Sequence, residues 1–390
     1  MGAATCASRG LQKGMGLTVI TSAVVSSVFA SRECGLFLGD SREVLRTMAD
    51  DSVDCTVTSP PYYSRRRHVG DSVNEIGSEK TVEEYVEALA SVGKELYRVT
   101  RATGSYWLNL DDKCERKEWL GIPWRVAFAM REIGWKIRSE VIWHKPKHVP
   151  NAATDRLTPA HELLFHFVKS KDAYYDMDAI RKPSSLPILG KNGVVKTPRW
   201  GSGVRYRRQI LASVALTEEE KRTALDALDS AVQKVKSGLL PGFRMLIRGT
   251  QRPTHGNASA LSGKAKELEK RGFAVLTHRP KGSVPTDVWT IQIEESIFPE
   301  DHYAVFPEAL VEMPIRATCP LGGTVLDPFV GSGTTAVVAL RLRRKAIGID
   351  SSAHCLEFTK KRILELSGQP ATPRQAPLNY TGKVSHGRMR

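Results

Sequence analysis

Residues 324–336 read TVLDPFVGSGTTA, and this stretch decides the fold of the chain. Thr324–Phe329 has the apolar, β-branched character of a buried strand, and Gly331-Ser332-Gly333 predicts a tight turn. A helix is predicted over Thr334–Arg343, and a further strand over Lys345–Asp350. Strand, glycine turn, helix and strand in this order form a βαβ unit. The stretch therefore predicts an α/β protein with a parallel sheet.

The glycine turn also suggests a ligand. Its pattern is Gly331-x-Gly333-x-x-Ala336, with Asp350 at the end of the next strand. Glycines let a ligand approach the backbone, and the free amides of a helix N-terminus bind a carboxylate or phosphate. An acid at the second strand end accepts hydrogen bonds from ribose hydroxyls. No Lys follows the glycines, so the turn is not a P-loop. Alone, the pattern fits NAD, FAD, S-adenosylmethionine or a purely structural turn.

A second unusual stretch lies far upstream. Val53–Thr58 reads as a buried strand and runs directly into Ser59-Pro60-Pro61-Tyr62. Two prolines cannot continue a central strand, so the strand stops with its carboxyl end exposed. A hydroxyl, a free carbonyl and an aromatic ring together suit an exocyclic amine on a planar base. Ser59 and the Pro60 carbonyl would hold the amine hydrogens, and Tyr62 would stack on the base. A rigid turn without chemical function is the open alternative.

Hydrophobic periodicity predicts several further elements. The helix that opens at Thr217 has Glu220 three residues on, the spacing of a capping box, and an apolar stripe of Leu225, Leu228, Val232 and Val235. The other predicted elements are helices over Thr81–Thr100, Pro123–Ile133, Gly263–Arg271 and Ala353–Leu366, and strands over Ser105–Leu110, Trp135–Trp143 and Leu163–Val168.

The charge of the chain is concentrated in one segment. The 390 residues contain 57 Lys+Arg and 42 Asp+Glu, a net charge of +15. Arg181–Thr286 alone holds 21 Lys+Arg and 7 Asp+Glu, a net of +14, and the remainder holds 36 and 35. Such a segment favours a phosphate backbone as partner over a merely solvated face. Hydrophobic content of 41% and charged content of 25% exclude a mostly disordered chain and a multi-span membrane protein.

The cysteines and the N-terminus bear on location. None of the six cysteines lies in a CxxC, so we expect reduced thiols and no metal site. Leu17–Ala30 is a short apolar run preceded by Arg9 and Lys13, and it resembles the apolar core of a signal peptide. A buried element or a loose tail is an equally open reading of it.

Taken together, these motifs resemble one enzyme family, the β-group DNA amino-methyltransferases of the N4-cytosine kind. Thr58–Tyr62 (TSPPY) matches the family's target-base motif, and Asp327–Thr335 (DPFVGSGTT) matches its S-adenosylmethionine loop. His302–Pro307 resembles the family's HxAxFP element, and Gly39-Asp40 resembles its acid near the adenine or ribose. The target-base motif precedes the cofactor loop, the circular permutation of that group. The resemblance covers about residues 34–366.

The resemblance implies a doubly wound Rossmann-like methyltransferase sheet with an inserted, mainly helical or irregular, basic recognition region. Its expected parts are an N-terminal extension (1–33), a catalytic half (34–180), the recognition region (181–286), a cofactor-binding half (287–367) and a tail (368–390). It implies a bacterial, cytoplasmic enzyme that binds double-stranded DNA and S-adenosylmethionine. No metal and no membrane are expected. A homodimer and a cognate restriction endonuclease stay open.

The site residues that follow fall into three groups. Those for the target base are Ser59, Pro60, Pro61 and Tyr62. Those for the cofactor are Asp40, His302, Phe306, Pro307, Asp327, Phe329, Gly331, Ser332, Gly333, Thr334, Thr335 and Asp350, of which the two Phe residues are equally read as plain core. Those for DNA phosphates are Arg65, Arg66, Arg67, Arg199, Arg205, Arg207 and Arg208.

Several alternatives remain at this point. Ser59 favours N4-cytosine because the N6-adenine branch usually has Asp or Asn there, but both reactions use one geometry, and an RNA substrate is open. C5-cytosine methylation needs a Cys nucleophile, generally in Pro-Cys, and no Pro-Cys occurs. A NAD- or FAD-dependent oxidoreductase leaves Ser59–Tyr62 and the basic segment unexplained. A non-catalytic DNA-binding protein explains the charge but neither motif.

Overall fold

The chain divides into two compact units, Met1–Ile180 with Thr286–Arg390 and Arg181–Pro285. The second unit begins where the basic segment begins. The residues that this computed structural model describes are 26–64, 76–147, 153–182, 188–189, 195–196, 203–237, 239–240, 242–250, 263–277, 282–293 and 307–367.

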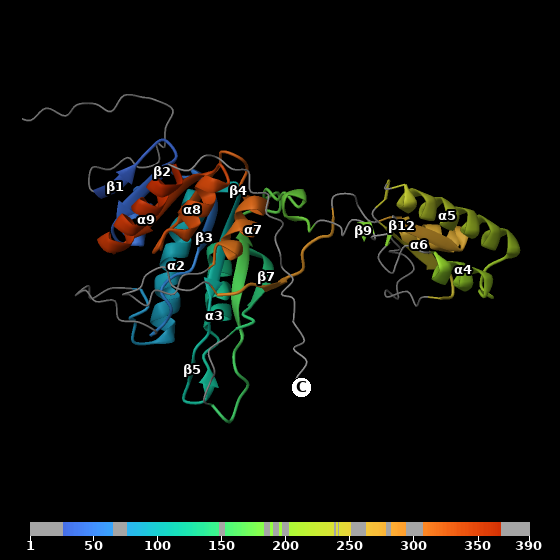
Figure 1. The fold of residues 1–390 in the computed structure, drawn as a ribbon. Helices are drawn as coiled ribbons and strands as arrows, with labels where there is room; N and C mark the ends of the chain where they lie inside the picture. The colour runs from blue at the N-terminus through green and yellow to red at the C-terminus, as the bar shows by residue number, and fades with distance from the viewer. Residues whose placement is uncertain are drawn as a thin grey trace, which may run out of the picture. The chain divides into compact units, whose positions relative to one another are not determined.

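A nine-stranded sheet forms the centre of the first unit (Figure 1). Its strand order is β1-β2-β15-β14-β3-β4-β8-β7-β13. The strands are β1 (Ser26–Ala30), β2 (Cys34–Leu38), β3 (Val53–Thr58), β4 (Thr100–Leu110), β7 (Lys136–His144), β8 (His161–Val168), β13 (Val288–Thr290), β14 (Thr324–Asp327) and β15 (Lys345–Asp350). The run from β2 to β4 is parallel, whereas β8 is antiparallel to both β4 and β7.

Helices cover both faces of this sheet. On one face α7, α8 and α9 lie side by side (Figure 1), and α1, α2 and α3 cover the other. The helices are α1 (Ser41–Arg46), α2 (Val82–Val99), α3 (Ile122–Ile133), α7 (Glu308–Thr318), α8 (Thr334–Arg341) and α9 (Ala353–Ser367). Each face buries its own apolar cluster against the strands. The predicted doubly wound α/β fold is confirmed.

Local sequence accounts for the boundaries. β3 is buried along its whole length and ends where the two prolines begin. α2 starts at a capping box that Thr81 and Glu84 form, and its buried residues recur along one face of the helix. A short hairpin of β5 (Cys114–Glu115) and β6 (Glu118–Trp119) precedes α3.

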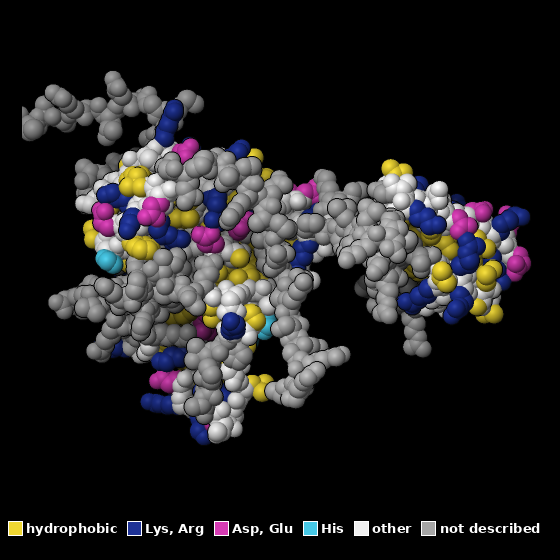
Figure 2. Space-filling model, in the orientation of Figure 1, with side chains coloured by type: hydrophobic (Ala, Val, Ile, Leu, Met, Phe, Trp, Pro, Cys, Tyr) yellow, Lys and Arg dark blue, Asp and Glu magenta, His cyan; other side chains and the backbone are white. Residues whose placement is uncertain are grey.

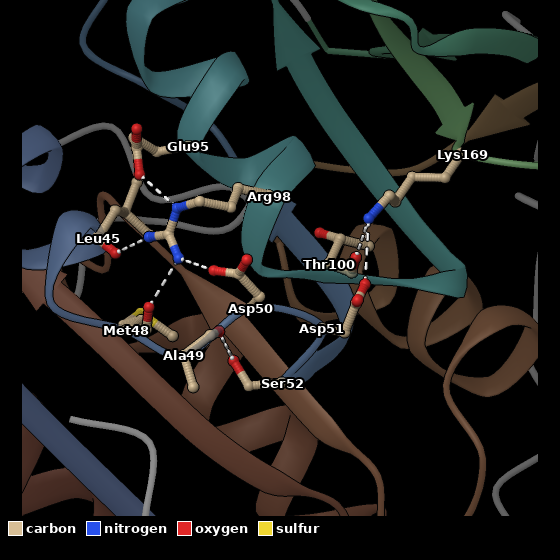
Figure 3. A network of polar contacts seen from close by, with 10 residues as sticks. All are labelled: Leu45, Met48, Ala49, Asp50, Asp51, Ser52, Glu95, Arg98, Thr100 and Lys169. Carbon is tan, nitrogen blue, oxygen red and sulfur yellow. Dashed lines mark hydrogen bonds and ion pairs between the residues drawn. The ribbon is translucent and has the colours of Figure 1, made fainter. Parts of the chain in front are cut away.

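The amino edge of β3 and β4 is fastened by two cations (Figure 3). Arg98 on α2 donates to the carbonyls of Leu45 at 2.7 Å and Met48 at 2.8 Å, and it also pairs with Asp50 and Glu95. Lys169, which follows β8, donates to Asp51 at 3.1 Å and to the Thr100 carbonyl at 2.6 Å (Figure 3). These contacts join α1, α2, β4 and β8 around the start of β3.

Part of the segment 1–33, which the resemblance assigns to an N-terminal extension, belongs to the central sheet. Ser26–Ala30 forms β1, which pairs antiparallel with β2 at the edge of the sheet. The end of the apolar run 17–30 is therefore a strand, and β1 is the edge strand of the sheet beside β2. Residues 17–25 lie outside the described part of the chain, as does the expected tail 368–390.

The second unit has a small core of its own. Helix α5 (Glu218–Lys236) packs with α4 (Val204–Leu211) over the antiparallel pair β11 (Phe243–Ile247) and β12 (Phe273–Thr277). The remaining elements are η1 (Asp178–Ile180) before it, and β9 (Ile188–Leu189), β10 (Val195–Lys196) and α6 (Gly263–Arg271) within it. Figure 2 shows Lys and Arg on its surface with Asp and Glu among them. The paired strands β11 and β12 were not predicted from the sequence.

The two ends of the second unit are joined. Lys182 and Ser283 form an isolated antiparallel bridge with two backbone hydrogen bonds of 2.9 Å. Arg181 adds a hydrogen bond from Nη1 to the Gly282 carbonyl at 3.2 Å. The chain therefore enters and leaves this unit at one place.

Within the described residues, no helix is long and apolar enough to cross a bilayer. Five of the six cysteines lie in the described part, at 34, 55, 114, 319 and 355, and each is free.

Candidate active site

The two loops that the sequence singles out meet at the carboxyl edge of the sheet. β3 and β14 are parallel neighbours, with Leu326 opposite Thr56. At their ends, the Thr58 hydroxyl donates a 2.6 Å hydrogen bond to Oδ1 of Asp327. The corner that follows β3 and the glycine loop that follows β14 are therefore adjacent, as expected for a site of an α/β protein.

The corner Ser59–Tyr62 leaves two oxygen acceptors open. The Ser59 hydroxyl donates to the Tyr62 hydroxyl at 3.2 Å, and its lone pairs have no partner among the described residues. The Pro60 carbonyl likewise accepts no hydrogen bond from the described part of the chain. The Pro61 carbonyl, by contrast, accepts from the Tyr85 hydroxyl at 2.8 Å. The corner thus presents two acceptors on backbone that proline rings hold rigid.

A polar cluster stands behind the corner; we call it the tyrosine cluster, and it consists of Tyr62, Asn109, Lys145 and Glu162. The Tyr62 hydroxyl donates to Oε2 of Glu162 at 2.7 Å. Asn109 Nδ2 donates both to Tyr62 and to Oε2 of Glu162, each at 2.7 Å. Lys145 pairs with the other oxygen, Oε1 of Glu162. Asn109 and Glu162 are buried, being 1% and 6% exposed.

The tyrosine cluster keeps the phenol of Tyr62 protonated. Burial and the neighbouring Glu162 carboxylate raise the pKa of Tyr62 well above its usual 10. The hydroxyl therefore stays neutral at physiological pH and acts as a hydrogen-bond donor. With its hydroxyl fixed at three partners, the ring of Tyr62 has a defined orientation.

Asp327 is a buried carboxyl that connects the two loops. Its oxygens accept from the Thr58 hydroxyl, from the Thr335 hydroxyl at 2.7 Å and from the Phe329 amide at 3.1 Å. Burial raises the pKa of Asp327 to about 6, and the hydrogen bonds only partly oppose this. With 1% exposure and three internal donors, it positions both loops from within the protein.

The two glycines of the loop serve different purposes. Both have positive φ, 49° at Gly331 and 83° at Gly333, which favours glycine. A Cβ on Gly333 would lie 2.5 Å from Cγ2 of Thr359, so this glycine is required for packing against α9. A Cβ on Gly331 would meet nothing closer than 3.9 Å. Gly331 therefore faces open space, into which a ligand can approach the backbone.

Two further acids lie near the glycine loop. Asp350 accepts from the Gly331 amide at 2.8 Å and from the Ser352 amide at 2.9 Å. Asp40 caps α1 through the Arg42 amide and also binds the Arg42 guanidinium at 2.6 Å. Burial tends to raise the pKa of Asp40, but the hydrogen bonds and charge of Arg42 lower it below its ordinary value. Asp40 therefore stays charged at physiological pH.

This edge fits S-adenosylmethionine. Helix α8 begins at Thr334 without a side-chain cap, so the first amides of the helix are free for a carboxylate. Gly331 leaves the space that a ligand would fill. The backbone amide of Gly39 donates to the Asp350 carbonyl at 3.0 Å, which places Asp40 and Asp350 on neighbouring strand ends, where ribose hydroxyls can be held.

The remaining predicted cofactor residues are only partly described. Phe329 is half-buried and packs against the cluster on the α2 face. Pro307 is buried and precedes the first turn of α7. His302 and Phe306 lie outside the described residues.

The predicted phosphate-binding arginines are not equivalent. Arg205, Arg207 and Arg208 are exposed on α4 of the second unit. Arg207 pairs with Asp229, whereas Arg205 and Arg208 have no acidic partner within the described part of the chain. Arg65, Arg66, Arg67 and Arg199 lie outside the described residues.

Sequence reasoning missed three members of the tyrosine cluster. Asn109 is a polar residue in the mainly apolar, buried end of β4, Tyr106–Leu110, and this break in the pattern is a signal of a special role. Lys145 follows β7 and Glu162 lies near the start of β8, and neither stands out by sequence. A search of the described residues for clusters of His, Cys, Asp or Glu able to hold a metal ion finds none.

Comparison with known proteins identifies a family and several similar proteins. The family model for N6/N4 DNA methylases matches residues 53–198 and 230–361. The Type II methyltransferase M.SfiI of Streptomyces fimbriatus is 31% identical over 386 residues, covering 83% of this chain and 90% of that protein. M.SmaI of Serratia marcescens, also named a Type II methyltransferase, is 26% identical over 362 residues, covering 85% and 91%.

Among solved structures, the PvuII DNA methyltransferase, described as cytosine-N4-specific, aligns with a TM-score of 0.52. The alignment covers 85% of this chain and 86% of that one, at 18% identity. At this level of identity the match concerns the fold, and it agrees with the doubly wound sheet.

Proposed function

The chain belongs to the N6/N4 family of DNA methylases, and from that premise we propose that it methylates the N4 amine of a cytosine flipped out of duplex DNA. Membership makes the chain a DNA methyltransferase that uses S-adenosylmethionine. The position of the methyl group on the base is the proposal. In the group of the family that we assign, the target-base motif precedes the cofactor loop.

The observation that carries the proposal is the pair of open acceptors at the corner. An exocyclic amine has two hydrogens, and Ser59 Oγ and the Pro60 carbonyl offer one acceptor each. The lone pair of such an amine is delocalised into the ring, so the amine is a poor nucleophile. Two hydrogen bonds to its hydrogens favour the pyramidal form, whose lone pair is free to attack. Holding the nitrogen in line with its electrophile then supplies much of the remaining acceleration.

The flipped base needs a surface on which to rest. Extrusion from the duplex costs on the order of a few kcal/mol. We assign Tyr62 to stack on the base, because its ring lies next to Ser59 and is fixed by the tyrosine cluster. Stacking on an aromatic ring is worth about 1–3 kcal/mol per base and offsets part of the cost.

S-adenosylmethionine supplies an electrophilic methyl group on a sulfonium. We assign its carboxylate to the amides at the start of α8, and its ribose hydroxyls to Asp350 with Asp40 on the neighbouring strand end. Ser332 belongs to the same glycine loop, and Thr334 and Thr335 begin α8. Asp327 holds this loop against the corner, and Phe329, His302, Phe306 and Pro307 are assigned to the surroundings of the pocket.

We assign the second unit to the DNA. Its net charge of +14 over Arg181–Thr286 suits a phosphate backbone, with Arg205, Arg207 and Arg208 on α4 and Arg199 nearby in sequence. Arg65–Arg67 follow the corner directly and are assigned to phosphates beside the flipped base. The relatives are bacterial Type II methyltransferases by name. We therefore propose a cytoplasmic enzyme of a restriction-modification system, with a cognate endonuclease and a homodimer as partners to be tested.

N6-adenine is the second candidate, because the matched family includes both amines by name. Ser59 at the first position of the corner favours cytosine, since the N6-adenine branch of the family usually has Asp or Asn there. Family membership removes the oxidoreductase and the non-catalytic DNA-binding protein from consideration.

The experiment is product analysis. The full chain is incubated with S-adenosylmethionine and unmethylated duplex DNA, and the digested nucleosides are separated by mass spectrometry. We expect N4-methylcytosine. N6-methyladenine alone would sink the cytosine assignment, and methylation of RNA alone would sink the assignment of DNA.

A further inference from the structure

The hydrogen bonds behind the corner form a directed chain. Ser59 Oγ donates to the Tyr62 hydroxyl at 3.2 Å, and that hydroxyl donates to Oε2 of Glu162 at 2.7 Å. Asn109 fixes this direction because its Nδ2 donates to both Tyr62 and Glu162. The reverse orientation of the Asn109 amide would place its oxygen against a carboxylate. Tyr62 therefore accepts from two groups and donates its own hydrogen to Glu162.

The far end of the chain is built to receive a proton. Oε2 of Glu162 faces Tyr62, while the Lys145 ammonium contacts the other oxygen, Oε1. The charge of the carboxylate is thus compensated without blocking the oxygen at the end of the chain. Lys145 itself lies 4.6 Å from the ring centre of Trp143, which holds the ammonium in place.

The near end of the chain faces the reaction that we propose. Methyl transfer forms an N–C bond at the amine and breaks an S–C bond, so the nitrogen becomes positive and carries one hydrogen too many. Ser59 Oγ is one of the two open acceptors at the corner, so it lies where that hydrogen emerges. A serine hydroxyl alone is a weak base and needs somewhere to pass the proton.

We propose that Ser59, Tyr62 and Glu162 form a proton relay that removes the surplus hydrogen from the methylated amine. The inference rests on the proposed function of the corner. Ser59 Oγ takes the amine proton as it gives its own to Tyr62, and Tyr62 gives its hydrogen to Oε2 of Glu162. The nitrogen becomes neutral, Glu162 becomes a carboxylic acid, and this acid later loses the proton to water. Both hydroxyls end with one hydrogen each, as they began.

Two features favour a relay over a simple anchor for the tyrosine ring. A hydroxyl that only anchors the ring needs the contacts of Tyr62 with Asn109 and Glu162. The further contact with Ser59 links Tyr62 to the acceptor that faces the amine. The raised pKa of Tyr62 also suits a group that exchanges one hydrogen for another and never carries the charge itself.

The first test compares single-turnover methyl transfer in the wild type, Tyr62→Phe and Glu162→Gln. Each variant nearly keeps the shape of the side chain but interrupts the relay at one group. We expect each rate to fall about 100-fold, within the range of general acid–base catalysis. Binding of S-adenosylmethionine and of DNA, measured by calorimetry, should stay within twofold. Tyr63→Phe is the matched control, because its hydroxyl donates to the Lys80 carbonyl outside the relay and its rate should not change.

A second readout separates proton transfer from mere positioning. Glu162→Ala leaves room for a small carboxylate, so formate should restore its rate at least fivefold, relative to chloride at equal ionic strength. Formate should not restore Tyr62→Phe, which lacks the hydroxyl that connects to the acid. Rates of Tyr62→Phe and Glu162→Gln within twofold of wild type would overturn the relay. So would a slow Glu162→Ala that binds both ligands normally and ignores formate.

The same experiment distinguishes the relay from the proposed function. Products are identified by nucleoside mass spectrometry, and the variants are compared as ratios to the wild type on whichever amine is methylated. N6-methyladenine in every sample would overturn the cytosine assignment and leave the relay to be judged by the ratios. N4-methylcytosine with unchanged ratios would overturn only the relay. A wild type that methylates no amine would overturn both.

Discussion

The amino and carboxyl edges of the central sheet differ in how completely their polar groups are hydrogen-bonded. At the amino edge, Arg98 and Lys169 donate to carbonyls and carboxylates of the segments around them (Figure 3). At the carboxyl edge, Ser59 Oγ and the Pro60 carbonyl retain acceptors that no described residue uses. Both edges belong to the same strand, β3. The hydrogen-bonded groups of the amino edge hold the surrounding segments together, whereas the two open acceptors of the carboxyl edge are free to bind a substrate.

The largest effect is expected from Ser59→Ala, which removes one open acceptor. We expect single-turnover methyl transfer to fall about 10²–10³-fold, the loss that follows removal of one polar contact made in a transition state. Affinity for S-adenosylmethionine, measured by calorimetry, should not change. Ser52→Ala is the matched control at the other edge of β3, since its hydroxyl donates only to the Ala49 carbonyl at 2.7 Å. If Ser59→Ala transferred methyl at the full rate, the open acceptor at the carboxyl edge would have no role in the reaction.

The second largest effect is expected in how the free energy of unfolding depends on pH through Asp327. Its pKa is about 6 when folded, above the ordinary 3.9 or so of Asp, so the folded chain binds this proton more tightly than the unfolded chain. The contribution of this group to the free energy of unfolding is therefore highest below about pH 4 and falls until about pH 6. Asp327→Asn removes the fall. We expect its stability relative to wild type to rise by up to about 3 kcal/mol between pH 4 and 7.

Urea unfolding at several pH values measures this difference. Asn at position 327 can still accept from Thr58 and Phe329 and can donate to Thr335, whose hydroxyl already lies 3.3 Å from the Val57 carbonyl. The fold is therefore expected to survive. A stability difference that is constant from pH 4 to 7 would show that the buried carboxyl does not carry the raised pKa.

Arg98→Met tests the amino edge, where the polar groups are hydrogen-bonded. The long apolar side chain keeps the packing, but the carbonyls of Leu45 and Met48 lose the hydrogen bonds that Arg98 donates. We expect the free energy of unfolding to fall by about 2 kcal/mol, since hydrogen bonds from a charged group are worth about 1.5–3 kcal/mol. Methyl transfer per folded molecule should be unchanged. Arg125→Met is the control, because its solvent-exposed pair with Glu83 should contribute little to the free energy of unfolding.

The smallest effect extends the comparison to the second unit. Arg205 and Arg208 have no acidic partner among the described residues, whereas Arg207 pairs with Asp229. For Arg205→Ala combined with Arg208→Ala, we expect DNA affinity to fall about tenfold and the slope of log K against log salt to lessen by about 2. Arg207→Ala should change the slope less. Fluorescence anisotropy at several salt concentrations measures it, and an unchanged slope in the double variant would exclude α4 from the DNA contact.

Sequence alone predicts those parts of the site that follow a single strand. The corner comes directly after β3 and the glycine loop after β14, so strand periodicity and turn residues place both at the same edge. The tyrosine cluster is different, because its members come from β4, β8 and the end of β7. Their meeting depends on the antiparallel position of β8 between β4 and β7, with Asn109 opposite Leu164 and Trp143 opposite Glu162. No local pattern specifies that register.

The second unit also contains one element that local sequence predicts and two that depend on long-range pairing. The helix after Thr217 is readable because a capping box and an apolar stripe occur within one segment. Of the stripe, Leu228 and Val235 are fully buried, and Leu225 and Val232 are partly buried. β11 and β12 are five residues each and lie far apart in sequence, so only their pairing and the cover of α4 and α5 make them strands.

The bridge between Lys182 and Ser283 has a consequence for how such enzymes diversify. A segment whose two ends are fastened to each other can be exchanged like a cassette, because the surrounding chain meets the same pair of ends whatever lies between them. Cuts at these two positions are therefore natural junctions for chimeras with related methylases. If the second unit reads DNA as we propose, exchange of the whole segment would change the DNA site, while the strands of the central sheet would stay unchanged.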